Sequence, residues 1–215
     1  MDEQHAFTNR SLQYVKKAYS SKKMEDIQWN CGFTSIQAAK MIINRFIPPK
    51  SKILDIGCGL GDHSIMFALN QMDVVGIDIM EQSIKIATQN AKLHRAKVHW
   101  VLGDALNMEF ENNTFDVAYD QYFFHNLKKS MRIPFAKEIS RVLKCGGFYT
   151  MIGFSDKMEK GSGPYRLTSK DIIKSFNRYF NCEHLEYFES LPINGRPQQI
   201  YWFSIWQKKF SKAAI

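Results

Sequence analysis

The chain has 215 residues, of which 45% are hydrophobic and 13% aromatic, so it can bury a full core within one elaborated domain. Its formal net charge of +8 permits an acidic partner. The basic residues are dispersed, however, and the densest groups, at 16–23 and at the C-terminus, lack the interleaved aromatic pattern of a nucleic-acid groove. Nucleic acid is therefore a possible partner that the sequence does not favour.

Membrane and metal classes are also disfavoured. The start of the chain is polar and unlike a leader, and no apolar run approaches the roughly 20 residues of a membrane span. We therefore expect a cytoplasmic protein without a membrane partner. The four cysteines are scattered and form no C-x-x-C pair, so we expect neither a metal site nor a disulfide scaffold.

Short apolar runs alternate with longer amphipathic ones, which predicts βα units around a mostly parallel sheet. Residues 1–33 precede this alternation and are predicted to form one or two short helices. In chain order we then predict a helix at 34–46, a strand at 52–57, a helix at 62–70, a strand at 73–78, a helix at 81–93, strands at 98–102 and 115–120, a helix at 131–143, a strand at 147–154, a helix from 168 or 169 to 180, and strands at 183–188 and 200–207. A turn-rich loop joins the last two strands and favours an antiparallel pair, so one of seven strands is reversed.

The stretch ILDIGCGLGD at 53–62 places three glycines between a strand and a helix. Such a loop brings backbone N–H groups to the carboxyl edge of the sheet, where open α/β folds bind ligands, although an ordinary tight turn is the alternative. The loop lacks the lysine of a phosphate-binding loop, and its even glycine spacing differs from that of a dinucleotide loop. Asp55 and Asp62 would repel a pyrophosphate and attract a cation. Asp78 ends the next strand, where an acid can accept both ribose hydroxyls. We therefore predict a cationic nucleoside as the ligand.

Five ordered segments resemble motifs of the class I S-adenosylmethionine-dependent methyltransferases: ILDIGCGLG, VVGIDIM, VLGDALNMEF, NTFDVAYD and ISRVLKCGGFY. The resemblance implies an α/β, Rossmann-like sheet of seven strands in the order 3-2-1-4-5-7-6, with strand 7 antiparallel and helices on both faces. It also implies one methyltransferase domain over residues 34–215. The implied cofactor is S-adenosyl-L-methionine, with S-adenosyl-L-homocysteine as its product.

The resemblance further implies the cofactor contacts. The loop from Gly57 to Gly61 would lie under the methionine part, Asp55 would orient its amino group, and Asp78 would hold the ribose. Asp104 and the Ala105 N–H would bind the adenine. The complete predicted set is Trp29, Asp55, Gly57, Cys58, Gly59, Gly61, Asp78, Ile79, Asp104, Ala105 and Asp120.

A narrower resemblance joins the chain to the thiopurine, thiol and tellurite methyltransferase-like group. IQWNCGFTS at 27–35 is similar to the segment that precedes the glycine loop there, so Trp29 would cover the cofactor near its carboxylate or else anchor the core. In that group the N-terminal segment closes over the cofactor, so residues 1–33 are predicted to be a helical lid. YDQYFFHNL and FSDKMEKGSGPYRLTS resemble the acceptor segments, but Gln121, Tyr122 and Asn126 depart from the pattern and leave the substrate open.

The implied reaction is an in-line displacement in which the protein mainly aligns the reactants and excludes water. Asp120 and His125 are the candidate catalytic bases, since both follow the fourth strand. Asp120 is alternatively a carboxylate that lines the positive end of the cofactor, and His125 alternatively caps or packs the next helix. Phe123 is predicted to be a core residue. The predicted acceptor pocket comprises Tyr19, Tyr122, Phe124, His125, Phe154 and Tyr165.

The substrate class follows from missing motifs. The chain lacks the [DNS]-P-P-[YFW] segment of nucleobase amine methylation, the Pro-Cys pair of cytosine C5 enzymes, the paired glutamates of arginine methyltransferases, and the acidic set of the metal-dependent catechol type. We therefore predict an enzyme that methylates a small molecule, with a thiol favoured over an amine or a hydroxyl. RNA or protein methylation and a binding-only domain are the alternatives, and the chain is expected to be a monomer or a homodimer.

Overall fold

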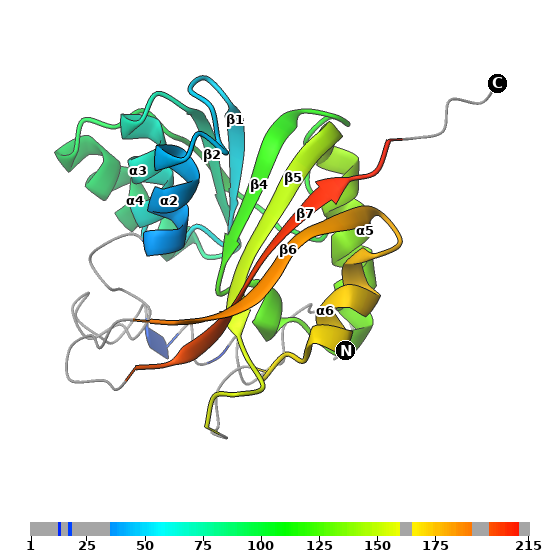
Figure 1. Ribbon diagram of the computed structural model, residues 1–215. Coiled ribbons are helices and arrows are strands. Elements are labelled where there is room, and N and C mark those ends of the chain that lie inside the picture. Colours follow the sequence, from blue (N-terminus) through cyan, green and yellow to red (C-terminus); the bar gives the residue numbers. More distant parts are fainter. Residues whose placement is uncertain (1–12, 14–16, 19–34, 160–164, 191–197, 211–215) are drawn as a thin grey trace.

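The computed structural model describes residues 13, 17–18, 35–159, 165–190 and 198–210, which form a seven-stranded sheet (Figure 1). The strand order is β3-β2-β1-β4-β5-β7-β6, and β7 runs antiparallel to both of its neighbours. The predicted order and the reversed strand are confirmed. The strands are β1 (Lys52–Ile56), β2 (Asp73–Asp78), β3 (His99–Leu102), β4 (Phe115–Gln121), β5 (Leu143–Phe154), β6 (Phe180–Glu189) and β7 (Ile200–Lys208).

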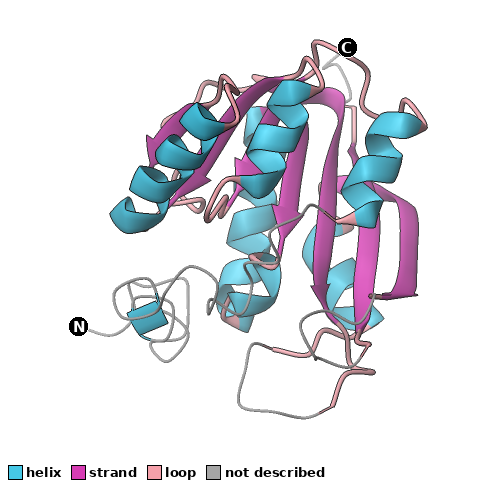
Figure 2. Ribbon diagram, turned by 90° about the vertical axis from the view of Figure 1, so that its left-hand side faces the viewer, coloured by secondary structure: helices cyan, strands magenta, loops and turns pink. Residues whose placement is uncertain are grey.

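Helices cover both faces of this sheet, as predicted (Figures 1 and 2). One face carries α2 (Ile36–Ile43), α3 (Asp62–Leu69) and α4 (Glu81–Leu93), and the other carries α5 (Arg132–Val142) and α6 (Ser169–Phe176). Two short 3-10 helices, η2 (Phe124–Asn126) and η3 (Lys129–Met131), connect β4 to α5. Among the described helices, none is long and apolar enough to cross a membrane.

The helix starts follow local sequence. Ser35 caps α2 by accepting from the Ala38 N–H at 3.1 Å. Thr168 and Asp171 form a reciprocal capping box at the start of α6. The helix α3 has no side-chain cap and begins at Gly61, which lies in the left-handed region. Its first backbone N–H groups are therefore not capped by the preceding side chain.

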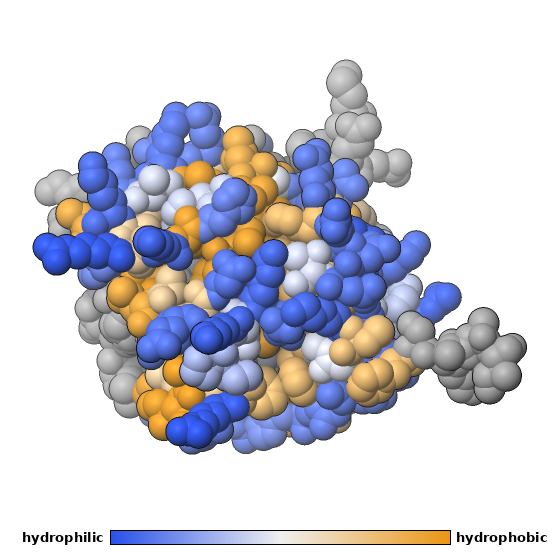
Figure 3. Space-filling model, turned by 90° about the horizontal axis from the view of Figure 1, so that it is seen from above, coloured by the Kyte–Doolittle hydropathy of each residue, from blue (hydrophilic) through white to orange (hydrophobic). Residues whose placement is uncertain are grey.

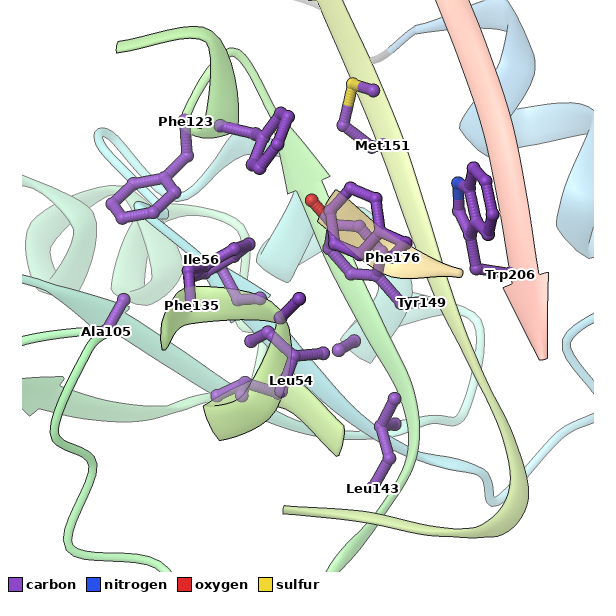
Figure 4. Close-up of a cluster of buried hydrophobic side chains, with 14 of the residues drawn as sticks. Leu54, Ile56, Ala105, Phe123, Phe135, Leu143, Tyr149, Met151, Phe176 and Trp206 are labelled. Carbon is purple, nitrogen blue, oxygen red and sulfur yellow. The ribbon is translucent and has the colours of Figure 1, made fainter. Parts of the chain in front are cut away.

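The main hydrophobic core lies between the sheet and the helices α5 and α6 (Figure 4). Phe176 is fully buried there, and its ring centroid lies 4.8 Å from that of Tyr149 and 5.3 Å from that of Trp206. Phe123 belongs to the same cluster, so the prediction that it is a core residue is confirmed.

Three predicted boundaries are wrong. The helix α2 ends at Ile43 instead of residue 46, because Arg45 takes a left-handed conformation. The helix α6 ends at Phe176 instead of residue 180, because Phe180 pairs with Lys208 as the first residue of β6. The strand β5 begins at Leu143, four residues before the predicted start, and includes a register shift that breaks the alternation expected of a strand.

The packing around Phe176 generates a stability prediction. Phe176→Ala should lower the free energy of unfolding by about 3 to 5 kcal/mol, because it leaves a cavity among buried rings. Ile173→Ala on the same helix, where the side chain is 42% exposed, is the matched control and should cost much less. Denaturant unfolding of both variants measures the difference, and equal losses would contradict the packing described.

Candidate cofactor site

The glycine loop between β1 and α3 has a backbone that side chains would obstruct. Gly57, Gly59 and Gly61 have φ values of +63°, +53° and +86°. A Cβ atom on Gly57 would lie 2.8 Å from the ring of Phe123, and one on Gly61 would lie 2.6 Å from the ring of Trp100. The loop therefore keeps both its left-handed turns and its close packing only with glycine.

Asp78 at the end of β2 fixes this loop. Its carboxylate accepts from the Gly59 N–H at 3.0 Å and from the Met80 N–H at 2.8 Å, one bond to each oxygen. On the other side, the Asn90 side chain of α4 donates to the Leu60 carbonyl at 3.0 Å. A carboxylate has about four acceptor positions, so Asp78 keeps capacity for the hydroxyls of a bound ribose.

Two carboxylates lie at the loop, that of buried Asp55 and that of half-buried Asp78. Asp55 on β1 is 3% exposed and accepts from the Ser64 hydroxyl at 2.6 Å. Burial raises its pKa to about 7, and the negative charges of Asp78 and Asp62 add to the shift. Burial likewise raises the pKa of Asp78. Neither Asp55 nor Asp78 forms an ion pair with a described residue, so the site fits a cationic ligand such as S-adenosylmethionine.

Cys58 and Ile79 complete the predicted methionine and ribose side. The Cys58 side chain is 9% exposed, and burial raises its pKa further above the ordinary range, so it remains a neutral thiol. Ile79 follows Asp78 and is 41% exposed. Trp29 and Tyr19, like the whole predicted lid at 1–33 apart from residues 13 and 17–18, lie outside the described residues.

The predicted adenine loop follows β3. The Asp104 carboxylate accepts from the Leu106 N–H at 2.9 Å, and Ala105 is 5% exposed. Two residues of α5 hold the continuation of this loop. Glu138 accepts from the Met108 N–H at 2.8 Å, and Arg141 donates to the Met108 carbonyl at 2.7 Å.

Sequence reasoning missed several supports of the site: Trp100, Asn90, Glu138 and Arg141. Trp100 fills the space that Gly61 and Gly76 leave open, and this contact depends on β3 lying beside β2. A glycine on a buried strand, such as Gly76, is the one sequence signal for a close neighbour there.

Asp120 is a structural residue. Its side chain is fully buried and accepts from the Phe123 N–H at 2.8 Å, the Phe124 N–H at 3.0 Å and the Tyr149 hydroxyl at 2.9 Å. Burial raises its pKa to about 7. This carboxyl holds the turn after β4, and its burial favours a structural role. That it acts as a base or lines the cofactor stays a prediction.

His125 is not placed as a base either. Its Nδ1 accepts from the Phe154 N–H at 2.9 Å, which occupies the basic lone pair of the neutral ring. Burial lowers its pKa to about 3, and the charges of Arg166 and Arg132 contribute. A histidine that is neutral at pH 7 and already accepts a backbone hydrogen bond cannot take a proton from a substrate. The alternative, that it packs within the turn after β4, agrees with this geometry.

The other predicted pocket residues divide into two groups. Phe124 is fully buried between Phe135 and Phe176, which favours a core position, and its place in the pocket wall stays a prediction. Tyr122 and Phe154 are half-buried, and their rings contact each other with centroids 6.0 Å apart. Further ring contacts join both residues to His125 and to Tyr201 of β7. Tyr201 was not among the predicted pocket residues. Tyr165 packs against Arg132.

A separate cavity of about 560 Å³ lies at the opposite end, where β1 and β2 begin. Ile42, Ile47, Leu69 and Met72 are among its lining residues. Figure 3 views the molecule from above and shows hydrophobic side chains gathered among hydrophilic ones. None of the predicted site residues lines this cavity, so it is not part of the cofactor site.

Comparisons with known proteins agree with the fold and the glycine loop. Residues 53–147 match the model of a methyltransferase domain family. The matched range extends from β1 into β5. The chain is 32% identical to a demethylmenaquinone methyltransferase of Bacillus cereus over 153 residues. This alignment covers 66% of this chain and 61% of that protein. The chain thus spans about three fifths of the length of this relative.

Solved structures share the fold of this chain. A structure from a study of the conversion of a disulfide bond into a thioacetal group during echinomycin biosynthesis has a TM-score of 0.82 at 14% identity, covering 94% of both chains. A SAM-dependent methyltransferase of Methanosarcina mazei has a TM-score of 0.70 at 22% identity, covering 79% of this chain and 98% of the other. TehB of Haemophilus influenzae has a TM-score of 0.68 at 16% identity, covering 83% of this chain and 64% of the other.

The geometry of Asp78 generates a binding prediction. Asp78→Asn should weaken S-adenosylmethionine binding at least tenfold, because charge-assisted hydrogen bonds contribute roughly 1.5 to 3 kcal/mol each. Asp73→Asn, an exposed change on the same strand, is the control and should leave the affinity unchanged. Titration calorimetry measures both, and equal affinities of the two variants would remove the ribose assignment.

The buried carboxyl of Asp55 makes the ligand-free protein sensitive to pH. Its pKa is raised from 3.8 to about 7, so the folded state binds a proton that the unfolded chain has lost over this range. Stability of the ligand-free protein should therefore rise as the pH falls from about 8 to about 5, while affinity for a cationic cofactor falls. Asp55→Asn should flatten both trends. Thermal unfolding and calorimetry test this, and parallel profiles for wild type and variant would exclude Asp55 as the titrating group.

Proposed function

We propose that the protein is a cytoplasmic enzyme that transfers a methyl group from S-adenosylmethionine to a small molecule. The observation that carries the proposal is the pair of carboxylates at the glycine loop, that of buried Asp55 and that of half-buried Asp78, neither of which forms an ion pair with a described residue. The methyltransferase domain match supports it. A phosphate ligand does not fit these charges.

The roles of the residues follow from the site and the family resemblance. The cofactor supplies the electrophilic methyl group when bound. The loop from Gly57 to Gly61 would support its methionine part, Asp55 would bind the ammonium, and Asp78 would accept the ribose hydroxyls. Asp104 and Ala105 would bind the adenine. In this proposal Glu138 and Arg141 keep the adenine loop in place.

An apolar or aromatic acceptor is favoured by three half-buried rings that contact one another. They are those of Tyr122 after β4, Phe154 of β5 and Tyr201 of β7. The name of the Bacillus relative, demethylmenaquinone methyltransferase, supports a small-molecule acceptor. Since Asp120 and His125 already accept hydrogen bonds from the protein, we favour a nucleophile that reacts without a base. A thiol ionises readily and remains our first prediction, followed by an amine or an acidic hydroxyl.

The test of the proposal is a transfer assay with purified protein. Mass spectrometry of the copurifying small molecules should detect S-adenosylmethionine or S-adenosylhomocysteine. Release of S-adenosylhomocysteine should then depend on an added thiol, amine or phenol, and Asp78→Ala should abolish it. Methyl transfer only to bulk RNA or protein would contradict the small-molecule acceptor, and failure to bind the cofactor would reject the enzyme function.

A further inference from the structure

Gln121, the last residue of β4, has a side-chain amide whose orientation is fixed by a hydrogen bond. The Tyr119 hydroxyl donates to Gln121 Oε1 at 2.7 Å, so the oxygen of the amide is engaged and its NH2 group is left to donate. Gln121 is half-buried, and within the described parts of the chain its nitrogen is not one of the buried atoms that lack a partner. No described residue accepts a hydrogen bond from it. Two accessible N–H donors therefore remain at the carboxyl end of β4.

A chain of hydrogen bonds holds Tyr119 in turn. Since its own proton goes to Gln121, its oxygen accepts from the Ser35 hydroxyl at 3.1 Å. Ser35 caps α2, and its backbone N–H donates to His63 Nε2 in the first turn of α3 at 3.1 Å. Tyr119 itself is fully buried. The Gln121 amide is therefore held in place before any ligand binds, which lowers the entropy lost on binding.

The register of the sheet places Gln121 beside the glycine loop. The neighbouring strands β1 and β4 are parallel, with Asp55 paired to Tyr119 (Figure 1). Gln121 lies two residues further along and thus at the level of Gly57, where the loop begins. Side chains alternate along a strand, so Tyr119 and Gln121 are on the same face of the sheet as Asp55. Asp55 and Gln121 are therefore near neighbours at one edge of the sheet.

The methionine part of S-adenosylmethionine carries its ammonium and its carboxylate on one carbon atom, so both groups must be accommodated close together. Asp55 is the proposed partner of the ammonium, and Asp62 and Asp78 add negative charge around it. These three acids repel the carboxylate of the ligand. A carboxylate taken out of water at such a place needs N–H donors.

We infer that the Gln121 amide binds the carboxylate of the methionine part, while Asp55 binds the ammonium. The inference rests on the proposed function and gives Gln121, which departs from the pattern of the acceptor segments, a role toward the cofactor. A neutral donor suits this position. It stabilises the carboxylate and leaves Asp55 to the ammonium, whereas an arginine would compete with the ammonium for Asp55.

Calorimetry with two ligands that differ only in this carboxylate tests the inference without any acceptor. S-adenosylmethionine and decarboxylated S-adenosylmethionine share the adenosine, the sulfonium and the ammonium. The titrations are made at about pH 8, above the pKa of about 7 of Asp55. Gln121→Leu should weaken binding of S-adenosylmethionine roughly tenfold or more and leave that of the decarboxylated ligand within about twofold.

Gln121→Glu separates ligand binding from packing. Glutamate can still accept from the Tyr119 hydroxyl, but it has no N–H to donate and adds a negative charge. It should weaken S-adenosylmethionine at least as much as Gln121→Leu does, and it should bind the decarboxylated ligand as tightly as wild type or more tightly. Gln71→Glu, an exposed change at the opposite edge of the sheet, is the control for charge and should leave both affinities unchanged.

Two results would overturn the inference. Unchanged affinity for S-adenosylmethionine in both Gln121 variants would show that the amide does not bind the cofactor. Equal losses for the two ligands would show that Gln121 supports the packing of the loop and does not recognise the carboxylate. Wild-type protein that binds neither ligand would instead reject the proposed function, so the two failures are distinguishable.

Discussion

The site depends on the close packing of two aromatic rings against the glycine loop. Phe123 and Trp100 occupy the space where side chains on Gly57 and Gly61 would lie, so the loop has little freedom to move away from its left-handed turns. The parallel register pairs Asp55 of β1 with Gly76 of β2, which brings Asp78 to the same edge of the sheet. The sheet and the loop together thus determine where the carboxylates lie.

Burial of these carboxylates makes the ligand-free site electrostatically unfavourable. A carboxylate removed from water needs hydrogen bonds or a cation, and Asp55 has the Ser64 hydroxyl but no described cation. Its raised pKa is the measure of this cost. A bound cation would restore the missing charge partner, so ligand binding and folding stability are coupled through the same group.

The sequence predicts what depends on local pattern. The alternation of apolar and amphipathic runs identified the seven strands, and the motif order implied their arrangement. The predicted ends of the elements were less accurate. The helix α6 was predicted to reach residue 180, for example, but Phe180 pairs with Lys208 and begins β6. Periodicity shows which residues are apolar but does not show which partner strand they will meet.

The hydrogen-bond partners of the candidate catalytic residues could not be predicted, for a related reason. Asp120 and His125 stand where a base would be expected, but Tyr149 and Phe154, each 29 residues away along the chain, supply their hydrogen-bond partners. Neither pairing can be read from sequence spacing. Local chemistry thus predicts where the acceptor would bind, and this stays a prediction, while tertiary contacts determine which side chains already have hydrogen-bond partners.

Proton release on cofactor binding tests the central claim most directly. Calorimetric titration of S-adenosylmethionine near pH 6.5, in two buffers of different ionisation enthalpy, measures the protons exchanged. The account predicts that the cation displaces a proton from Asp55, so that wild type releases protons and Asp55→Asn releases fewer. Binding with no proton release, or with the same release in both proteins, would contradict a cofactor site built on an uncompensated buried carboxyl.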